Sequence, residues 1–433
     1  MMRSHYTNEL SKKLSGEKVT VAGWVHEIRD LGKLKFLIVR DREGKVQVTA
    51  KKETTDKKVL DAIDSLSKES VVSVEGTVRE DSKAPGGFEL TPEKIIVVAV
   101  SESPLPLDVT GKVPAELDTR LTNRFMDVRK PEVAAIFTIR AKIQEAYREY
   151  FIKNDFIEIN PPSIIAAASE GGTDLFAITY FEREAYLAQS PQLYKQIMMA
   201  SGLDKVFITM PIFRAELHNT TKHLNEVFML DAELAYIKDE EDVMKHLEGV
   251  THHMYRKVAD ECKNELSALG RELSVPKLPL KRVTYDDALD FLSGKDVKVS
   301  WGDDLATDAL KALAEEYAEP YFITRWPTQI RAFYSRPLDG DPTRCGAFDL
   351  MAGDIELSSG AQRIHDHGQL VEALKKKKLN PANFEFYLKA FQYGMPPHGG
   401  FGMGAERITE ALTGVKNIRE CVLFPRDRTR LTP

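Results

Sequence analysis

The sequence predicts an α+β protein in which a small all-β domain precedes a larger domain of mixed strands and helices. A chain of 433 residues is long enough for two or three domains. From residue 18 to residue 100, five runs rich in β-branched side chains enclose one helical stretch at 55–66. From residue 131 onward, stretches with helical spacing of apolar residues alternate with strand-like runs.

The first domain has the pattern of an OB-type β-barrel. Five strands with a helix between the third and the fourth are typical of this barrel, which commonly binds single-stranded nucleic acid. We expect the domain to span residues 1–104 and a hinge rich in proline and polar residues to follow at 105–130. The expected strands are 18–28, 33–41, 45–50, 70–80 and 88–100.

The second domain is expected at 131–433. Pro131 stands in the first turn of a long helix, after which come a short strand, FIEIN, and two prolines. The stretch 239–318 is mostly helical and lies between strand-rich parts, which indicates an insertion. Further strands are expected at 206–216, 225–235, 321–326, 347–353 and 354–360, and helices at 365–377 and 381–391.

Charge and cysteine content narrow the class of protein. The net charge of −6 excludes a basic nucleic-acid coat. Residues 1–50 nevertheless carry ten basic and six acidic side chains, which indicates a polyanion partner or an ordinary mixed surface with equal weight. Three widely spaced cysteines argue against a zinc site or a disulfide framework. With no signal peptide and no apolar run of about eighteen residues, we expect a cytoplasmic protein.

A strand-loop-strand pattern carries the strongest chemical signal. VFITMPIFRAE and NEVFMLDAELA read as strands, and the polar segment LHNTTKHL links them. Arg214 closes the first strand, with Glu216 and His223 nearby in sequence. The planar guanidinium suits a phosphate, so we expect this group to hold a phosphate and an adenine edge.

A glycine-rich loop is expected near the end, where GGFGMGAER precedes a helix. Its glycines let the backbone approach a ligand, although packing alone explains them equally well. Arg407 lies in the first helical turn, where the helix dipole disfavours a cation unless an anion is near. No Gly-Lys-Ser/Thr follows, so this is not a P-loop.

Two further segments carry possible ligands. In DIELSSGAQR, Glu356 and Ser358 share a strand face, and an irregular turn is expected to expose Ser359, which with Glu356 could hold Mg²⁺. An edge-strand carboxylate is the plain alternative. The loop SEGGTDLF carries Glu170 and is either a mobile lid that meets an ammonium group or an ordinary turn. A zinc site at His365 and His367 lacks an evident third ligand.

Together these segments resemble class II aminoacyl-tRNA synthetases of the aspartyl/asparaginyl/lysyl subgroup, and most closely the archaeal-type aspartyl enzymes. FIEINPP resembles motif 1, FRAE with its loop resembles motif 2, and GFGMGAER resembles motif 3. The resemblance covers nearly the whole chain. It implies a catalytic domain with an antiparallel sheet flanked by helices, not a Rossmann fold, and a homodimer formed through motif 1.

The resemblance also implies roles for particular residues. Arg214 and Arg407 would be the catalytic pair, on the α- and γ-phosphates, and Glu356 with Ser359 would hold Mg²⁺. One departure is Val227, where many relatives carry an aromatic residue that stacks on adenine; Phe228 follows it. The implied ATP contacts are Arg214, Glu216, Lys222, His223, Leu224, Glu356, Gly404, Ala405, Glu406 and Arg407, and the implied aspartate contacts are Glu170, Gln192, Lys195, Arg214, Ser359 and Arg363.

The implied reaction joins L-aspartate to ATP and then transfers the aspartyl group to tRNA. Lys195 and Arg363 would hold the substrate's side-chain carboxylate, and asparagine would leave charge unpaired there. A polar mismatch of this kind rejects a substrate by roughly 10⁴-fold. Asparaginyl relatives lack the lysine, so aspartate is preferred over that rival. A paralogue that makes asparagine or only binds RNA should lack a motif arginine or the barrel, and this chain has both.

In the barrel, the residues that match family anticodon contacts are Arg29, Phe36, Gln47 and Glu89. Without the resemblance, Phe36 would be taken as a core aromatic. Archaeal relatives that reject the asparagine anticodon carry Trp and Lys where this chain has His26 and Pro85. We therefore expect tRNA(Asp) and also tRNA(Asn) to be charged. An enzyme that discriminates between them is the alternative.

Overall fold

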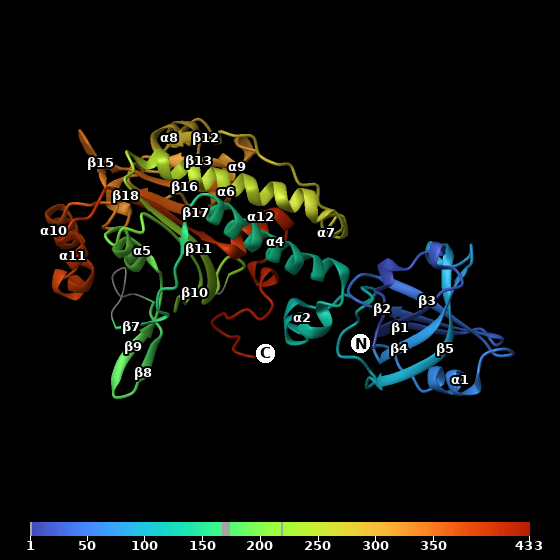
Figure 1. Cartoon of the computed structure of the whole chain (residues 1–433). Coiled ribbons are helices and arrows are strands. Elements are labelled where there is room, and N and C mark those ends of the chain that lie inside the picture. Colours follow the sequence, from blue (N-terminus) through green and yellow to red (C-terminus); the bar gives the residue numbers. More distant parts are fainter. Residues whose placement is uncertain (1, 167–173, 218–219) are drawn as a thin grey trace. The chain divides into compact units, whose positions relative to one another are not determined.

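The computed structural model describes residues 2–166, 174–217 and 220–433. The chain divides into two compact units, Met1–Lys130 and Pro131–Pro433 (Figure 1). Each unit has its own sheet and its own apolar core, so the two are described separately.

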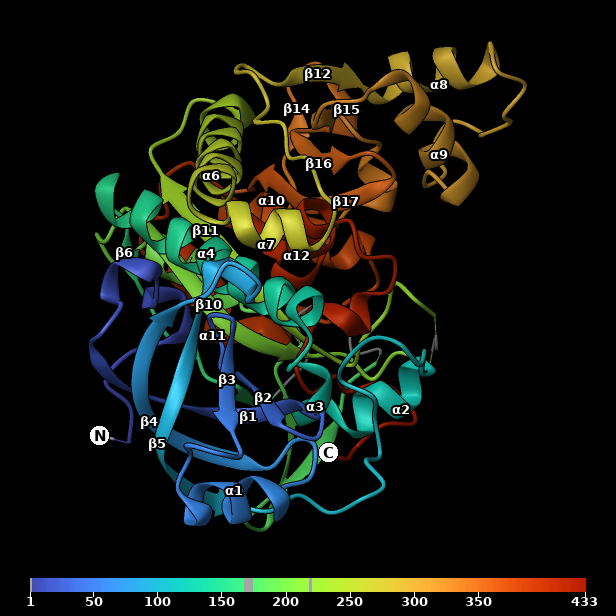
Figure 2. The same cartoon turned by 90° about the vertical axis from the view of Figure 1, so that its right-hand side faces the viewer.

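The first unit is a closed five-stranded barrel, which confirms the expected OB-type fold. Helix α1 (Lys57–Asp64) lies between β3 and β4 in the chain and beside the strands in Figure 2. Alternate residues such as Val21, Leu37 and Val48 fill the interior and are fully buried. In their order around the barrel, the strands are β1 (Lys18–Asp30), β2 (Leu34–Arg40), β3 (Lys45–Lys51), β5 (Phe88–Ala99) and β4 (Val71–Glu80).

The segment expected to be a hinge contains two short helices, α2 (Leu117–Thr122) and α3 (Arg124–Asp127). Asp127 is fully buried and accepts hydrogen bonds from Arg120, Arg124 and Lys130. Because a buried carboxylate needs such partners, this cluster orders a stretch whose proline content predicts an irregular linker.

The second unit is built on an eight-stranded sheet. Its central strands are antiparallel, as expected, while the edge pairs β12–β13 and β10–β6 are parallel. The sheet order is β12 (Lys281–Thr284), β13 (Tyr321–Thr324), β16 (Ala347–Ala352), β17 (Ile355–Gln362), β18 (His398–Gly404), β11 (Glu226–Ala235), β10 (Lys205–Phe213) and β6 (Ile157–Glu158).

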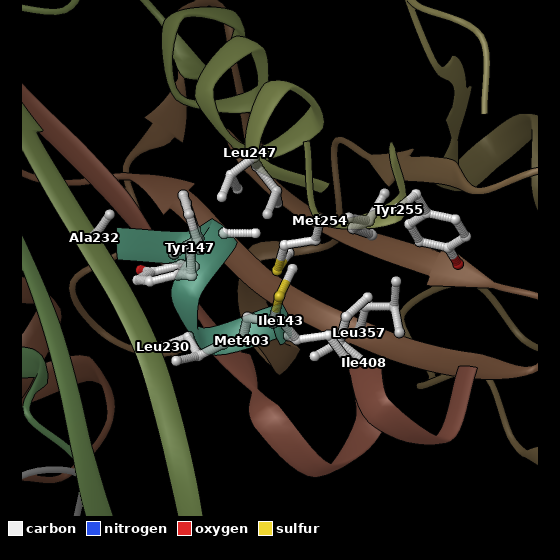
Figure 3. Packing of buried hydrophobic residues seen from close by; sticks show 14 of the residues in the cluster. Ile143, Tyr147, Leu230, Ala232, Leu247, Met254, Tyr255, Leu357, Met403 and Ile408 are labelled. Carbon is white, nitrogen blue, oxygen red and sulfur yellow. The ribbon is translucent and has the colours of Figure 1, made fainter. Parts of the chain in front are cut away.

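Three helices cover one face of this sheet: α4 (Pro131–Lys153), α6 (Glu240–Glu261) and α12 (Ala405–Thr413). Figure 3 shows Ile143, Leu247 and Ile408 from these helices in one apolar cluster with Leu230 of β11. Burying each such side chain contributes about 1.5–3 kcal/mol, which fixes the sheet and leaves its opposite face for polar groups.

The stretch 239–318 is mostly helical, as expected, and parts of it belong to the main core and the main sheet. Helix α6 belongs to the main apolar core, and β12 is an edge strand of the main sheet. Only α8 (Tyr285–Ser293) and α9 (Thr307–Glu316) build a cluster of their own against the sheet edge, while α7 (Lys263–Ala268) extends α6. The sequence shows helical spacing here but not which core each helix joins.

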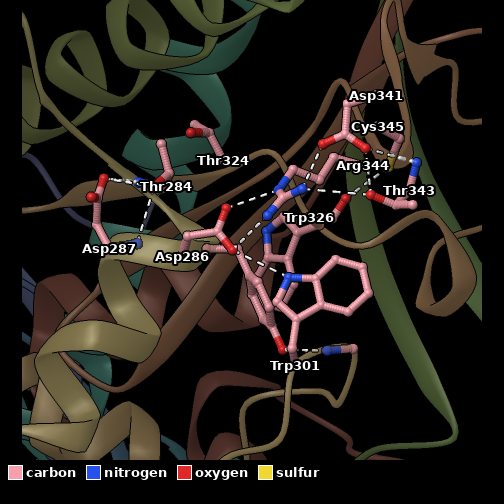
Figure 4. A network of polar contacts seen from close by, with 12 residues as sticks. Thr284, Asp286, Asp287, Trp301, Thr324, Trp326, Asp341, Thr343, Arg344 and Cys345 are labelled. Carbon is pink, nitrogen blue, oxygen red and sulfur yellow. Dashed lines mark hydrogen bonds and ion pairs between the residues drawn. The ribbon is translucent and has the colours of Figure 1, made fainter.

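A polar network ties α8 to the hairpin of β14 (Pro337–Leu338) and β15 (Asp341–Cys345). The Arg344 guanidinium donates to both oxygens of Asp286, at 2.8 and 2.9 Å, and Trp301 Nε1 donates to the same carboxylate (Figure 4). This network anchors the far end of the sheet.

The remaining elements frame the other face. Helices α5 (Gln192–Met199), α10 (His367–Lys376) and α11 (Glu385–Gln392) share one apolar cluster. A small sheet has the order β7 (Ile164–Ile165), β9 (Arg183–Leu187) and β8 (Ala177–Tyr180). Among the described residues, no helix has the length and apolar character needed to cross a membrane.

Candidate active site

A cleft of about 380 Å³ opens on the sheet face opposite α4, α6 and α12. Strand β11 shows how the faces divide: Leu230 and Ala232 enter the helix-side core, whereas Met229 and Asp231 line the cleft. Of the residues chosen from the sequence, the cleft is lined by Gln192, Arg214, Glu216, Lys222, His223, Leu224, Glu356, Ser359, Arg363, Gly404, Glu406 and Arg407.

Three chosen residues are absent from this lining. Lys195 and Ala405 are fully buried behind it. Glu170 lies outside the described residues, so its expected contact with an ammonium group stays a prediction.

At one end of the cleft, two buried cations meet two buried carboxylates. Lys195 Nζ donates to Asp231 Oδ2 and to the Phe401 carbonyl, both at 2.8 Å, and lies 3.4 Å from Glu233 Oε2. Arg363 Nε donates to Glu233 Oε1 at 3.1 Å. Burial raises the pKa of Asp231 despite Lys195. For Glu233, burial acts in the same direction, but Arg363 and Lys195 outweigh it and hold the pKa below its usual value.

Asp231 and Glu233 are the functional candidates that sequence reasoning missed. Their signal was present, because two carboxylates two residues apart in an otherwise apolar strand must share a face. Asp231 lines the cleft, and its buried Oδ1 atom has no hydrogen-bond partner among the described residues. It therefore offers an acceptor to a bound cationic group.

The glycine-rich segment is not a loop, as the sequence suggested, but strand β18 in the middle of the sheet. Gly400 and Gly402 pair with Glu233 and Asp231 across β11. A Cβ atom at Gly400 would lie 2.0 Å from Glu233 Oε2. The buried carboxylates therefore demand at least one glycine whether or not a ligand is present.

At the other end of the cleft lie Arg214 and Arg407, whose side chains are 41% and 38% exposed. Arg407 Nη1 donates to the Glu356 carbonyl at 2.9 Å and lies 3.4 Å from Glu356 Oε1. Arg214 Nη1 is 3.8 Å from Glu216 Oε1. Both guanidinium groups line one cleft and are only loosely paired, which suits them to an anionic ligand.

The expected turn at Ser358–Ser359 is also a strand, since β17 continues to Gln362. A β-bulge opposite Met351 shifts the register, so Glu356 pairs with Met351 and Ser359 with Asp349. Met351 and Asp349 are two residues apart, which places Glu356 on one face with Ser359 instead of Ser358. The bulge, which sequence alternation did not reveal, brings these two oxygen ligands together.

The side-chain oxygens of Glu356 and Ser359 are of the kind that magnesium prefers as ligands. Burial, with help from Asp349, raises the pKa of Glu356, so a nearby cation would relieve its charge. Arg331 donates to Asp349 and to Ser359 Oγ. Among the residues that the structure describes, no group of three His, Cys, Asp or Glu side chains could hold a metal. A two-ligand site suits Mg²⁺, which keeps water and phosphate as its other ligands.

One expected ATP contact, Glu406, has other partners here. The Glu406 carboxylate accepts a hydrogen bond from Arg140 at 2.7 Å and another from the Phe228 backbone N–H. These bonds join α12 to α4 and β11 beside the cleft. Val227 lines the cleft, whereas Phe228 packs against the helix-side core. Phe228 therefore does not replace the missing aromatic platform.

The barrel carries a second candidate site on its outer surface. Phe36 pairs with Thr49 and with Arg29, and it does not belong to the barrel core as the alternative held. Glu89 accepts from Thr49 and from Gln47 Nε2. The residues chosen for anticodon contact thus lie on adjoining strands.

His26 and Pro85 lie elsewhere in this unit. Arg40 Nη1 is 3.0 Å from His26 Nδ1, and Lys45 Nζ is 2.8 Å from His26 Nε2. Burial and these two cations lower the pKa of His26 and favour the neutral ring. Pro85 begins a short 3₁₀ helix, Pro85–Gly87, between β4 and β5.

The sequence matches two family models. Residues 116–428 match tRNA synthetases class II (D, K and N), and residues 19–98 match the OB-fold nucleic acid binding domain. The chain therefore belongs to the class II tRNA synthetases of the D, K and N group.

Several curated relatives and solved structures extend this match. The chain is 54% identical to the "Aspartate--tRNA(Asp) ligase" of Thermococcus kodakarensis, with 100% of both chains covered. It is 53% identical to the "Aspartate--tRNA(Asp/Asn) ligase" of Methanothermobacter thermautotrophicus, covering 100% of this chain and 99% of the relative. The asparaginyl-tRNA synthetase of Pyrococcus horikoshii, solved with asparaginyl-adenylate, has a TM-score of 0.94 at 35% identity, with both chains fully covered.

Proposed function

We propose that this chain is an aspartate–tRNA ligase that forms aspartyl-adenylate from L-aspartate and ATP. The observation that carries the proposal is one cleft with Arg363 at one end, where Lys195 lies buried behind the lining, and with Arg214 and Arg407 at the other. The relatives at 53–54% identity that are named for aspartate support the choice of amino acid.

The first step is an in-line displacement at the α-phosphorus of ATP. The α-carboxylate oxygen of aspartate forms the new bond to phosphorus, and pyrophosphate leaves with the electron pair of the broken bond. Arg214 would neutralise the α-phosphate and Arg407 the γ-phosphate, so that positioning and charge compensation supply the acceleration. Glu356 and Ser359 would hold Mg²⁺, which when bound compensates charge on the phosphates.

The second step transfers the aspartyl group to tRNA. A terminal hydroxyl of the tRNA attacks the carbonyl carbon of the adenylate, AMP leaves, and the hydroxyl proton passes to the departing phosphate or to solvent. No side-chain base is required, because the adenylate is already an activated acyl group.

Selection of aspartate would rest on charge balance. Lys195 and Arg363 already face two carboxylates, so a substrate carboxylate would share their donors while Asp231 Oδ1, with Gln192, receives the substrate ammonium. An asparagine amide would present N–H groups to these donors. Exchange of labelled pyrophosphate into ATP should require aspartate; exchange driven equally by asparagine would overturn the proposal.

We propose further that both tRNA(Asp) and tRNA(Asn) are charged. Support comes from His26 and Pro85, and from the relatives named for Asp/Asn. Charging of the two transcripts should differ by less than about tenfold in kcat/KM, and the His26→Trp/Pro85→Lys variant should widen the difference. A wild-type preference above about a hundredfold that the variant leaves unchanged would reject this hypothesis.

A homodimer through motif 1 is proposed for the surface of α4 and β6. Ile152 and Ile157 are 63% and 46% exposed and offer apolar surface that a partner subunit would cover. Sedimentation should give twice the chain mass, and Ile152→Asp/Ile157→Asp should shift it toward the monomer. A monomeric wild type would refute the assignment.

Three buried cysteines, none in a disulfide, agree with a cytoplasmic enzyme.

A further inference from the structure

The hairpin that carries Arg214 ends in an unusual way. In an antiparallel ladder, hydrogen-bonded pairs of facing residues, which exchange both N–H···O bonds, alternate with pairs that exchange none. Arg214 N donates to the Asn225 carbonyl at 2.9 Å, but the Asn225 amide does not return the bond. Instead, the backbone N–H of Asn225 donates to the backbone carbonyl of Arg426 at 2.9 Å. A carbonyl from residues 422–433 thus occupies the place that Arg214 would take in a regular ladder.

The side chain of Asn225 then supplies the missing donor. Its Nδ2 donates to the Arg214 carbonyl at 2.7 Å and to the Glu216 carbonyl at 3.0 Å. Asn225 is only 8% exposed, so these bonds are shielded from water. The backbone of Arg214 is held at both its N–H and its carbonyl by one residue, and that residue is held by the segment 422–433.

The same part of the chain contacts the loop at two more points. Ile418 N donates to the Thr221 carbonyl at 3.0 Å, and Arg428 Nη1 donates to the Leu217 carbonyl at 3.2 Å. Contacts from residues 418–428 therefore lie on both sides of the loop between β10 and β11.

Asp427 keeps this segment rigid. Its carboxylate accepts from the Thr429 amide and hydroxyl and from the Arg430 amide, each at 2.9 Å, and from Arg419 Nε at 2.7 Å. Although burial acts against ionisation, these bonds lower the pKa of Asp427 to about 2. The ionised carboxylate joins the turn at 427–430 to the 3₁₀ helix Ile418–Cys421.

We propose that the segment 422–433 positions Arg214, the arginine assigned to phosphate. Because the Arg426 carbonyl accepts the backbone N–H of Asn225, the β10–β11 ladder ends there, and the Asn225 side chain is free to bond the carbonyls of Arg214 and Glu216. This inference rests on the proposed function, since it assigns Arg214 to ATP. Asn225 and Asp427 are positioning residues that touch no substrate themselves.

The test compares Asn225→Asp and Asp427→Asn with Asp341→Asn. Asp341 is a matched control, because it also accepts from a threonine amide and hydroxyl two residues on and pairs with an arginine, but in the β14–β15 hairpin away from the cleft (Figure 4). Asn225→Asp keeps the size of the side chain and removes its N–H donors.

In aspartate-dependent pyrophosphate exchange, the two cleft-side variants should raise the KM for ATP about tenfold and change the KM for aspartate less. The control should stay within about twofold of wild type, at a comparable shift in the unfolding midpoint. Arg428→Ala should raise the KM for ATP a few-fold, and Arg428→Lys, which retains a donor, should recover it. If both cleft-side variants keep a wild-type KM for ATP, or if the control matches them, the inference is wrong.

Failure of the proposed function would look different. In that case the wild type itself would show no aspartate-dependent exchange. Calorimetric titration of ATP into the same variants would still decide the positioning role, because weaker ATP binding in the cleft-side variants alone would support it and equal binding in all would overturn it.

Discussion

The two ends of the cleft hold their cations in opposite ways. At the end proposed for the amino acid, Lys195 is fully buried and bonded to Asp231, and Arg363 is bonded to Glu233. At the end proposed for the phosphates, Arg214 and Arg407 are about two-fifths exposed and loosely paired. Buried side chains that are fixed by ion pairs and shielded from water discriminate between similar small substrates, because a substrate without the matching charged group leaves a buried charge unpaired. Exposed guanidinium groups can follow a flexible triphosphate as its charge changes.

The largest effect is expected from Lys195→Ala. Removing one partner of a buried pair leaves Asp231 uncompensated, at a cost of about 3–5 kcal/mol in the free energy of unfolding, and the KM for aspartate should rise steeply. Denaturant unfolding and pyrophosphate exchange measure the two effects. Adding Asp231→Asn should recover stability without recovering aspartate activation. Near-normal aspartate activation in Lys195→Ala would refute the pocket assignment.

A substitution at the exposed end of the cleft should lower the rate of adenylate formation without lowering the free energy of unfolding. Arg407→Ala removes charge compensation on the phosphates and should lower kcat for adenylate formation by about 10²–10³-fold. The unfolding midpoint and the dissociation constant for tRNA should remain close to wild type, since the Arg407 side chain is partly exposed and only loosely paired. A large loss of stability in this variant would erase the contrast between the two ends.

The buried end should also control stability against acid. Burial lowers the pKa of His398, which lies near Glu233, to about 4. Its pKa in the unfolded chain is higher, near 6.5, so the unfolded state binds the proton first as pH falls. Neutral His398 therefore contributes up to about 3 kcal/mol to the free energy of unfolding. This contribution is fully present above about pH 6.5 and is lost as the pH falls toward 4. Denaturant curves at pH 7 and pH 5 should show this loss, and His398→Gln should flatten it.

The smallest effect concerns the barrel. Phe36→Ala removes a partly exposed stacking face, worth about 1–3 kcal/mol per base, and should raise the KM for tRNA roughly tenfold. Pyrophosphate exchange, which needs no tRNA, should not change. If exchange falls as well, Phe36 supports folding and not anticodon contact.

Much of the fold could be predicted because strand and helix patterns are local. The five barrel strands match alternation within single runs, and α4 begins at Pro131 as its helix-start signal predicts. The family also followed from motif order. The β18 segment was misjudged because its glycines suggest a loop, whereas they make room for carboxylates on the neighbouring strand. The β17 bulge was missed because it depends on pairing with β16.

By itself, the sequence determined the α+β class, the barrel, the synthetase family and twelve of the twenty-seven residues that line the cleft. Tertiary structure decided which groups meet: the charges of Lys195 with Asp231 and of Arg363 with Glu233, and the backbone N–H of Asn225 with the backbone carbonyl of Arg426. The physical reason is that periodicity reports which way a side chain points within one element. Charge pairing and hydrogen bonding depend on distances between elements far apart in the chain, and only packing sets those distances.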